Sequence, residues 1–324
     1  MYCLELAGSD DAFAAREAAT AASDVDVVAP GLATARVIDA GRARRLAYTH
    51  RVSTLVGRTD ADVASARALL SAASVDREGS VRVRARNVRS RSAASTRAAE
   101  RELGDVLVDR GFDVDLDDPD HELRALFGEE VCLLGWLTVA VERSFGDRRP
   151  TDRPFVQPGS MAPMDARAVA NLAGAGPDAR LLDPMCGTGG LLLEAGLVGS
   201  SVVGADAQWK MARGTRENLE AALGPDAGTV VRADATQLPF RDDAFDAVAF
   251  DAPYGRQSKI ARHDLSDLVA GALAEAVRVA PRGVLVADRE WVRPAVDAGW
   301  SVEEVFRRPV HGSLDRYVHL LSTG

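Results

Sequence analysis

Four aspartates in the second half of the chain stand where acidic side chains could bind a ligand. Each ends a short apolar run that is typical of a buried strand, as Asp251 ends the run at residues 248–250. Ligands of open α/β sheets bind beyond the carboxyl ends of the strands, where carboxylates can accept hydrogen bonds from hydroxyl and amino groups. Taken singly, each aspartate could also be an ordinary polar residue at a strand end. The four are Asp183, Asp206, Asp234 and Asp251.

A glycine-rich turn follows the first of these aspartates, in the stretch LLDPMCGTGGLLLEAG at residues 181–196. Gly187 and Gly189 remove side chains where a ligand approaches the backbone, and Gly190 opens the next helix. A dehydrogenase that binds NAD would share a glycine turn and a later acid. Asp183, however, lies where a dinucleotide would bring its pyrophosphate. An acid there repels phosphate but suits a cationic ligand that bears an amine.

S-adenosylmethionine meets these requirements because it carries a sulfonium and an amine but no phosphate. The turn DPMCGTGG resembles motif I of class I methyltransferases, which implies this cofactor. Asp206 is then placed to accept hydrogen bonds from two ribose hydroxyls, and Asp234 to meet the edge of the adenine ring. The predicted cofactor-binding residues in this part of the chain are therefore Asp183, Gly187, Gly189, Asp206 and Asp234.

The stretch DAPY at residues 251–254 resembles the (D/N)PP(Y/F) signature of methyltransferases that act on an exocyclic or amide nitrogen. Such a nitrogen is a poor nucleophile because its lone pair is delocalised. The resemblance implies that Asp251 and the carbonyl of Ala252, beside Pro253, hold the amine with its lone pair aimed at the methyl group. Tyr254 is expected to stack on a base that has been taken out of its helix.

Ala252 departs from this signature, which has proline at the same position. The backbone carbonyl survives the change, whereas the fixed φ of proline does not. The departure therefore bears on the rate more than on the type of reaction, and we expect Ala252→Pro to be tolerated. The signature does not identify the amine, since adenine, cytosine, guanine and glutamine amides are all methylated by proteins that carry it.

Composition limits the class of protein. The chain has 324 residues, which suits two or three small domains, and 47% of them are hydrophobic. No run approaches the roughly 18 apolar residues of a membrane span, and we recognise no signal peptide. Cys3, Cys132 and Cys186 stand far apart, which argues against a zinc site and a disulfide framework. We therefore expect no metal site and a cytoplasmic location.

Charge is distributed unevenly along the chain. The net charge is −9, and Lys210 and Lys259 are the only lysines among 39 basic residues. Residues 42–58 contain five arginines and no acid, and residues 82–97 contain six arginines and no acid. In an acidic protein such clusters are candidate phosphate-binding patches, although solvated faces balanced by acids elsewhere would look the same.

The order of expected elements divides the chain. Residues 1–45 show the pattern of strand, helix and strand; residues 46–143 contain helices near 60–70 and 95–110 and strands at 80–88, 121–127 and 131–141. The segment 142–160, with Pro150, Pro154 and Pro158, interrupts the periodicity. Beyond it, strands that end near residues 183, 206, 234, 251 and 288 alternate with helices. This alternation predicts a parallel, doubly wound α/β sheet.

Nearly the whole chain resembles the archaeal tRNA guanine-10 N2-methyltransferases. The stretch from SVRVRARNV to HELRALF resembles a THUMP domain, an RNA-binding module, preceded by a small ferredoxin-like domain. The stretches RRPTDRPFVQPGSM and DPMCGTGGLLLEAG carry the rest of the resemblance. It implies an N-terminal α+β region and a Rossmann-like class I methyltransferase domain, divided into residues 1–45, 46–143, a linker at 144–160 and 161–324. It also implies Ser160 of PGSM as a cofactor contact, and N2-methyl- or N2,N2-dimethylguanosine at position 10 as the product.

The RNA contacts follow from the same resemblance and from charge. Arginines of the RVRARNVRSR run are expected to contact phosphates of tRNA. Alternation along a strand puts Arg82, Arg84 and Arg86 on one face, so either all or none of them should matter. Two cations just past residue 254 could hold phosphates beside the flipped base, or could simply be solubilising charges. The predicted RNA-binding residues are Arg82, Arg84, Arg86, Arg89, Arg91, Arg256 and Lys259.

Other functions stay open from the sequence. The same chemistry could act on another tRNA guanine or on ribosomal RNA, and Ala252 leaves room for an RNA-binding scaffold with an inactive methyltransferase domain. A protein-glutamine methyltransferase is disfavoured by the THUMP-like half. Some relatives use a small zinc-binding activator protein, so the expected partners are tRNA and such an activator, with the chain monomeric on its own. Whether one methyl group or two are added is open.

Overall fold

The computed structural model describes residues 1–226, 228–254, 262–311 and 314–324. The chain forms two compact units, Met1–Arg143 and Ser144–Gly324. The predicted linker begins at the boundary between these units, and the predicted division near residue 45 lies inside the first unit. That finer division into domains stays a prediction. Across the described residues, no helix is both long and apolar enough to span a membrane.

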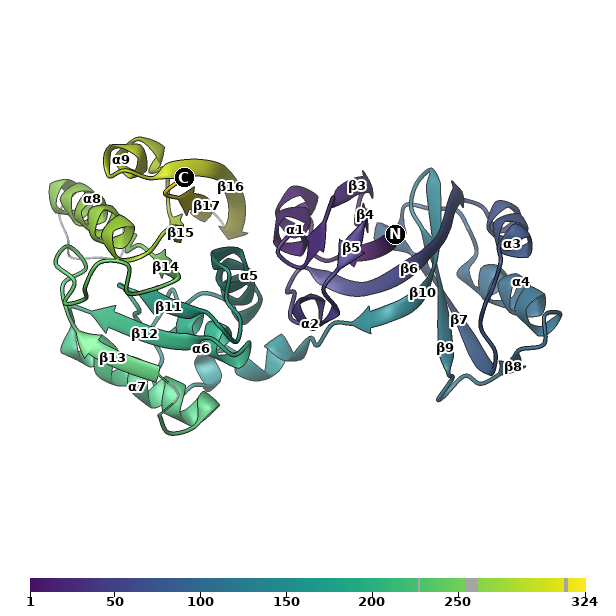
Figure 1. The fold of residues 1–324 in the computed structure, drawn as a ribbon, viewed down its shortest axis with the longest axis horizontal. Coiled ribbons are helices and arrows are strands. Elements are labelled where there is room, and N and C mark those ends of the chain that lie inside the picture. The colour runs from purple at the N-terminus through teal and green to yellow at the C-terminus, as the bar shows by residue number, and fades with distance from the viewer. Residues whose placement is uncertain (227, 255–261, 312–313) are drawn as a thin grey trace. The chain divides into compact units, whose positions relative to one another are not determined.

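The second unit is built on a seven-stranded sheet with the order β13-β12-β11-β14-β15-β17-β16 (Figure 1). Strands β11 to β15 pair in parallel, as the alternation of strands and helices predicts. Side chains of residues 247–250 in β14 are all buried, which explains the unbroken apolar run. The predicted α/β, Rossmann-like class is confirmed. The parallel strands are β11 (Arg180–Asp183), β12 (Ser201–Asp206), β13 (Gly228–Arg232), β14 (Ala247–Asp251) and β15 (Arg282–Ala287).

A C-terminal hairpin completes this sheet and is not predicted from the sequence. β17 (Leu314–Ser322) enters antiparallel between β15 and β16 (Ser301–His311). Ala287, the last residue of β15, pairs with Tyr317 near the start of β17. Because the strands run in opposite directions, the first residues of β17 lie at the carboxyl end of β15, the end at which ligands bind in this fold.

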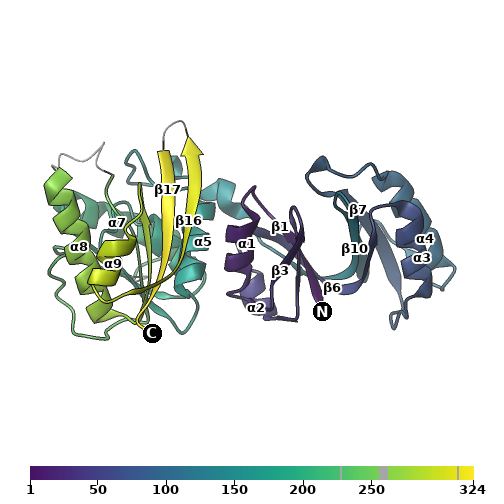
Figure 2. The same ribbon diagram turned by 90° about the horizontal axis from the view of Figure 1, so that it is seen from above.

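Helices cover both faces of the second sheet. In Figures 1 and 2, α8 and α9 lie on one side and α5 on the other, and α6 packs against α5 and α7. Phe250, Leu273 and Leu285 belong to the core between α8 and the sheet. This packing holds α8 against β14 and β15. The helices are α5 (Pro163–Ala173), α6 (Gly190–Leu197), α7 (Trp209–Leu223), α8 (Arg262–Val279) and α9 (Val292–Asp297), after the 3-10 turns η2 (Ser144–Arg148) and η3 (Pro150–Asp152).

The first unit contains one eight-stranded sheet with the order β3-β4-β1-β6-β10-β9-β7-β8. The long strand β6 pairs with β1 on one side and with β10 on the other, so the sheet is continuous. Its strands are β1 (Tyr2–Leu6), β3 (Asp26–Ala29), β4 (Leu32–Ala35), β6 (Thr49–Asp60), β7 (Ser80–Asn87), β8 (Asp113–Val114), β9 (His121–Phe127) and β10 (Val131–Ala140). A separate ribbon is formed by β2 (Ala22–Ser23) and β5 (Val37–Ile38).

The helices of the first unit determine which way the arginines of β7 point. Val81 and Val83 pack with Leu103 and Leu107 in the core beneath α3 and α4. Side chains alternate along a strand, so the arginines at 82, 84 and 86 point to the opposite face of the sheet. The helices are α1 (Asp11–Ala18), α2 (Ala40–Ala43), α3 (Val63–Ala72) and α4 (Thr96–Val108), with the 3-10 turn η1 (Val88–Ser90).

Candidate active site

Three of the four predicted aspartates meet at one edge of the second sheet. Asp183, Asp206 and Asp251 are the last residues of β11, β12 and β14, and β11 lies between the other two strands. Asp234 differs from the prediction because β13 ends at Arg232. Its exposed carboxylate, in the turn that follows, accepts hydrogen bonds from the N–H and the hydroxyl of Thr236 at 2.9 and 2.8 Å.

The glycine turn has the backbone that its sequence predicts. Gly187 and Gly189 have φ of 54° and 77°, in the left-handed region that favours glycine, and α6 begins at Gly190. A Cβ atom at Gly189 would lie 2.8 Å from Cγ2 of Thr215 on α7. The hydroxyl of Thr215 donates to the carbonyl of Gly187 at 2.8 Å, which fixes the turn. A side chain at either glycine would therefore distort the turn.

Of the carboxylates beside this turn, Asp183 is buried and Asp206 is half-buried. Asp183 has 2% of its surface exposed, and its Oδ1 accepts a hydrogen bond from the N–H of Met185 at 3.0 Å. Burial raises the pKa of Asp183 well above its usual range, and the charges of Asp251 and Asp206 raise it further. Asp206 accepts hydrogen bonds from the N–H groups of Gly187 and Gln208 at 3.1 and 2.8 Å, and burial raises its pKa as well. A cationic or hydrogen-bond-donating ligand would stabilise the ionised form of both carboxylates.

Residues 155–160 are fixed against the glycine turn. Ser160 Oγ lies 3.0 Å from Thr188 Oγ1 and donates to the carbonyl of Gln157 at 2.9 Å. Asn218, buried on α7, donates to the carbonyls of Phe155 and Thr188, both at 2.9 Å, and accepts from the N–H of Phe155 at 2.9 Å. Asn218 and Ser160 therefore join residues 155–160 to the glycine turn.

The arginines before this segment anchor the helix that follows the turn. Glu194 on α6 is fully buried and pairs with Arg148 at 3.0 Å and Arg167 at 2.8 Å. Arg153 is also buried, and its Nη1 would lie 3.2 Å from a Cβ atom at Gly190. The RRP and RPF stretches, which carry much of the resemblance, thus have a structural role beside α6.

Asp251 belongs to a chain of side-chain hydrogen bonds. The hydroxyl of Tyr254 donates to Oδ1 of Asp251 at 2.7 Å and accepts from Nε of Arg316 at 2.9 Å. Arg316 is buried on β17, and its Nη2 also donates to the carbonyl of Gly159 at 3.5 Å. Burial raises the pKa of Asp251 to about 6, and the charge of Arg316 opposes the rise. The stacking of Tyr254 on a base stays a prediction.

Ala252 has a structural role that its place in the signature does not reveal. It is buried, and its N–H donates to the carbonyl of Val286 at 2.8 Å, which extends the pairing of β14 with β15 by one residue. Proline has no N–H, so it would leave this carbonyl without its partner. We therefore reverse the expectation from the sequence: Ala252→Pro should lower the melting temperature. Pro253, the next residue, is partly exposed.

A pocket of about 180 Å³ joins these elements. Ser160, Asp183, Gly187 and Asp251 line it, whereas Gly189 and the other two aspartates do not. Among the described residues that line the pocket, two are carboxylates and none is lysine or arginine. Such a lining repels phosphate and suits an amine and a sulfonium. The residues present therefore fit S-adenosylmethionine.

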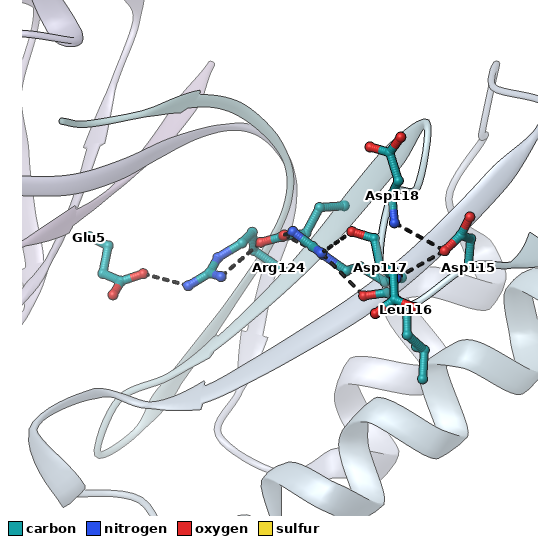
Figure 3. A network of polar contacts seen from close by, with 8 residues as sticks. Glu5, Asp115, Leu116, Asp117, Asp118 and Arg124 are labelled. Carbon is teal, nitrogen blue, oxygen red and sulfur yellow. Dashed lines mark hydrogen bonds and ion pairs between the residues drawn. The ribbon is translucent and has the colours of Figure 1, made fainter.

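Five of the six predicted RNA-binding arginines lie in the first unit, and four of these five bind carboxylates of that unit. In Figure 3 the guanidinium of Arg124 faces the carboxylate of Glu5, with which it pairs at 2.8 Å. Arg124 also pairs with Glu122 at 2.8 Å, and Glu122 pairs with Arg82 at 2.7 Å. Arg82 also donates to the carbonyl of Leu116 at 3.3 Å. The remaining pairs are Arg86 with Glu5, Arg89 with Asp11, and Arg91 with Glu129.

Arg84 is different from its neighbours on β7. It is exposed, and its side chain has no hydrogen-bond or ion-pair partner among the described residues. Arg82, Arg84 and Arg86 share a face, as predicted, but the expectation that all or none of them matter does not follow from that face. Arg256 and Lys259 lie outside the described residues.

Several residues of the site were not singled out from the sequence. Arg316 lies in a stretch with no motif, and Asn218 and Thr215 lie in an ordinary amphipathic helix. Their roles arise from contacts between distant parts of the chain. Arg316 contacts Tyr254 across 62 positions, Asn218 contacts Phe155 across 63, and Thr215 contacts Gly187 across 28. The asparagine inside a helix is the one local signal, because this residue is uncommon there unless it has a specific partner.

Comparisons with known proteins agree with this geometry. A family model described as "RMKL-like, methyltransferase domain" matches residues 150–314. The chain is 36% identical over 303 residues to the tRNA (guanine(10)-N2)-dimethyltransferase of Methanothermobacter thermautotrophicus, covering 88% of this chain and 87% of that protein. It is 32% identical to the enzyme of the same name from Pyrococcus abyssi, covering 68% of each chain.

The fold has a counterpart among solved structures. TrmN from Thermus thermophilus aligns over 99% of both chains with a TM-score of 0.51 and 24% sequence identity. That likeness supports the two-part architecture, while the higher identities above carry the relationship itself. The chain belongs to the tRNA (guanine(10)-N2)-dimethyltransferase family.

Proposed function

We propose that this protein uses S-adenosylmethionine to methylate the exocyclic N2 of guanine in RNA, namely guanine 10 of tRNA, giving N2-methyl- and N2,N2-dimethylguanosine. The observation that carries the proposal is the position of Asp251, which ends β14 and lines the same acidic pocket as Asp183 and the glycine turn. A group that binds an amine thus lies beside a site that suits a sulfonium. Membership of the family supports guanine as the base and tRNA as the substrate.

The cofactor site uses the buried acids and the glycine turn. S-adenosylmethionine, when bound, supplies an electrophilic methyl group and leaves as the neutral thioether. Two carboxylates line the pocket, and Asp183 is the one nearer to the glycine turn in the sequence. Asp183 would hold the ammonium group. Gly187 lines the pocket and lets the ligand approach the backbone, whereas Gly189 supports the turn beside Thr215 of α7. Ser160 would contact the methionine end of the ligand. Asp206 and Asp234 retain free lone pairs for the ribose and the adenine.

Asp251 and the carbonyl of Ala252 would accept hydrogen bonds from the two N–H groups of the guanine amine. This arrangement holds the nitrogen pyramidal and aims its lone pair at the methyl carbon. As the N–C bond forms and the S–C bond breaks onto sulfur, the nitrogen becomes positive, and the carboxylate of Asp251 stabilises that charge. One N–H proton then leaves the nitrogen for Asp251, whose pKa of about 6 permits return of the proton to solvent at neutral pH.

RNA would be recognised by the first unit and by residues that follow Asp251 in the chain. A THUMP-like module at residues 46–143, after a ferredoxin-like domain at 1–45, would recognise the shape of tRNA. Phosphate contacts are assigned to the exposed Arg84 and, from the sequence alone, to Arg256 and Lys259, with Tyr254 stacking on the flipped guanine.

Partners and location extend the proposal. We infer tRNA as the partner, a small zinc-binding protein as a candidate activator, a monomeric chain in the absence of that activator, and a cytoplasmic location. The low number of cysteines and their separation in the sequence support a reducing compartment. Methylation of a different guanine in tRNA or of ribosomal RNA is the competing function.

Incubation of the purified protein with unmodified tRNA and labelled cofactor tests the proposal. One transcript carries guanine at position 10, and a matched transcript carries adenine there with its pairing partner adjusted. We expect labelled N2-methyl- and N2,N2-dimethylguanosine from the first transcript alone. Label in both transcripts would indicate a different guanine. Binding of S-adenosylmethionine without any label in tRNA or ribosomal RNA would indicate an inactive scaffold.

A further inference from the structure

Arg316 links three parts of the site that are distant in sequence. Its Nε donates to the hydroxyl of Tyr254 at 2.9 Å, and its Nη2 donates to the carbonyl of Gly159 at 3.5 Å. The same hydroxyl donates to Oδ1 of Asp251 at 2.7 Å. The guanidinium therefore connects the segment over the glycine turn with the residue expected to hold the amine.

The direction of β17 makes this contact possible. Tyr317 pairs with Ala287, the last residue of β15, so Arg316 lies one residue beyond the end of that strand. Asp251, which pairs with Val286, ends β14 at the same edge of the sheet. Beyond Ala287, β15 no longer separates β14 from β17. The long side chain of Arg316 can therefore reach from β17 to the loop after β14.

Arg316 is also held from its other side. It pairs in register with Arg308 on β16, and Arg308 forms an ion pair with Asp165 of α5 at 3.3 Å. Arg316 has 7% of its surface exposed, so its geometry is set by the protein and not by solvent. A buried arginine with two oriented acceptors is suited to fixing the position of a neighbour, because its planar guanidinium directs hydrogen bonds along fixed lines.

We propose that Arg316 is a positioning residue for the methyl-transfer reaction: it holds the Tyr254 hydroxyl, and through it the Asp251 carboxylate, in the orientation that receives the guanine amine. This inference rests on the proposed function. The hydroxyl of Tyr254, which bonds both side chains, transmits the position of Arg316 to Asp251. Oδ2 of Asp251 is left to accept a hydrogen bond from the substrate amine.

The charges around Asp251 make the role measurable. Burial, Asp165 and Asp288 disfavour the ionised form of this carboxyl, and Arg316 is the cation that favours it. Tyr254 donates a hydrogen bond to the ionised form. Loss of the charge of Arg316 should therefore raise the pKa of Asp251 from about 6, and the methylation rate should begin to fall at a higher pH.

The test is the pH dependence of single-turnover methylation with tRNA, measured for the parent, Arg316→Gln, Arg316→Lys and Tyr254→Phe. Arg307→Gln is the matched control, because Arg307 lies on the same hairpin, is mostly exposed and pairs with Asp315. We expect Arg316→Gln to lower the rate roughly tenfold to hundredfold and to move the acid limb of the profile to higher pH. Arg316→Lys should keep the acid limb near the parental pH but remain slow, since it retains the charge and loses the planar geometry.

Two further expectations complete the test. Tyr254→Phe should also move the acid limb to higher pH, since Asp251 loses its hydrogen bond, and Arg307→Gln should leave both rate and profile unchanged. A parental profile in Arg316→Gln, or a loss of rate that is equal at every pH and matches a fall in melting temperature, would overturn the positioning role. Asp251→Ala, measured beside them, separates this inference from the proposed function: full activity in that variant would overturn the function itself.

Discussion

The pKa of a buried carboxylate is lowered in the first unit at Glu122 and raised in the second unit at Asp183. In the first unit, burial alone would raise the pKa of Glu122, but hydrogen bonds from Arg124 and Arg82 outweigh burial and lower the pKa. In the second unit, burial raises the pKa of Asp183 well above its usual range, and no arginine or lysine of the described residues forms an ion pair with it. One acid has its counter-ions inside the fold and the other does not.

This difference separates acids that hold the fold from acids that are kept for a ligand. An ionised group buried without a counter-ion costs stability, so it persists where function requires it. Glu194 shows that the distinction is not one between units, because this acid lies beside the glycine turn and is paired with Arg148 and Arg167. Asp183 and Asp251 line the pocket, and neither forms an ion pair within 4.0 Å with a described residue, although the charge of Arg316 acts on Asp251.

The largest expected effect is on the stability of the first unit. Glu122→Ala leaves Arg82 and Arg124 without this carboxylate, and breaking a buried pair typically costs about 3–5 kcal/mol. Because the pKa of Glu122 is lowered from 4.5 in the folded state, its stabilisation is present above pH 4.5 and is lost as pH falls through the folded value. Urea unfolding of the full chain at several pH values measures both effects.

Glu129→Ala is the control for this variant, because its pair with Arg91 is exposed and such pairs contribute little. Equal stability of the two variants would show that the buried network is not what holds the first unit. Calorimetry should find S-adenosylmethionine binding unchanged in Glu122→Ala, since no pocket residue is touched.

The next effect concerns the reaction rate. Asp251→Ala removes the acceptor of the guanine amine, and loss of one such group typically lowers a rate about 10²–10³-fold. Asp251→Asn should retain part of the activity, since its amide oxygen still accepts a hydrogen bond. Affinities for cofactor and tRNA should stay nearly parental, because the contribution is largest at the transition state. Single-turnover rates are the measurement, with melting temperatures as the check that a structural strand-end residue has not simply been lost.

Asp251 and the buried arginine contacts differ in how well the sequence predicts them. Asp251 and the glycine turn are predictable because strand ends and glycine turns are local signals within a few residues. The Glu5–Arg124 pair joins residues 119 positions apart, and Arg316 meets Tyr254 across 62 positions, so no short pattern announces either. Arginine clusters predict a positive surface, but the acids that neutralise Arg82 and Arg86 come from other strands. β16 and β17 are not predicted because SVEEVFRRPVH and LDRYVHLLS lack strict polar–apolar alternation and the first contains Pro309, although Gly312 and Ser313 between them are residue types typical of a hairpin turn.

A smaller effect is expected at Asp183, where function and stability should change in opposite directions. Asp183→Asn should weaken S-adenosylmethionine binding roughly tenfold to hundredfold, as expected for loss of a charged acceptor. It should also raise the melting temperature. The pKa of Asp183 is raised from 3.8 on folding, so its favourable contribution is present below pH 3.8 and is lost as pH rises through the folded value. The advantage of the variant should therefore grow with pH.

Calorimetry and thermal melting at a series of pH values test both parts of this prediction. Glu194→Gln is the matched comparison, since a buried acid that already has its arginines should lose stability when its charge is removed. If Asp183→Asn also lost stability, Asp183 would be a structural acid and the contrast drawn above would not hold.

The smallest effect is expected for Arg84, and it tests whether the paired arginines of β7 are available to RNA at all. Arg84→Gln should weaken tRNA binding and reduce the slope of log affinity against log salt by roughly 0.7–0.9, as for one lost phosphate contact. Arg82 and Arg86 are engaged with Glu122 and Glu5, so Arg82→Gln should lower the melting temperature and leave the salt slope of the folded protein near the parental value. Filter binding at several salt concentrations gives the slopes. A loss of slope in Arg82→Gln equal to that in Arg84→Gln would mean that tRNA competes for the internal ion pairs, and the carboxylates of the first unit would then regulate RNA binding as well as hold the fold.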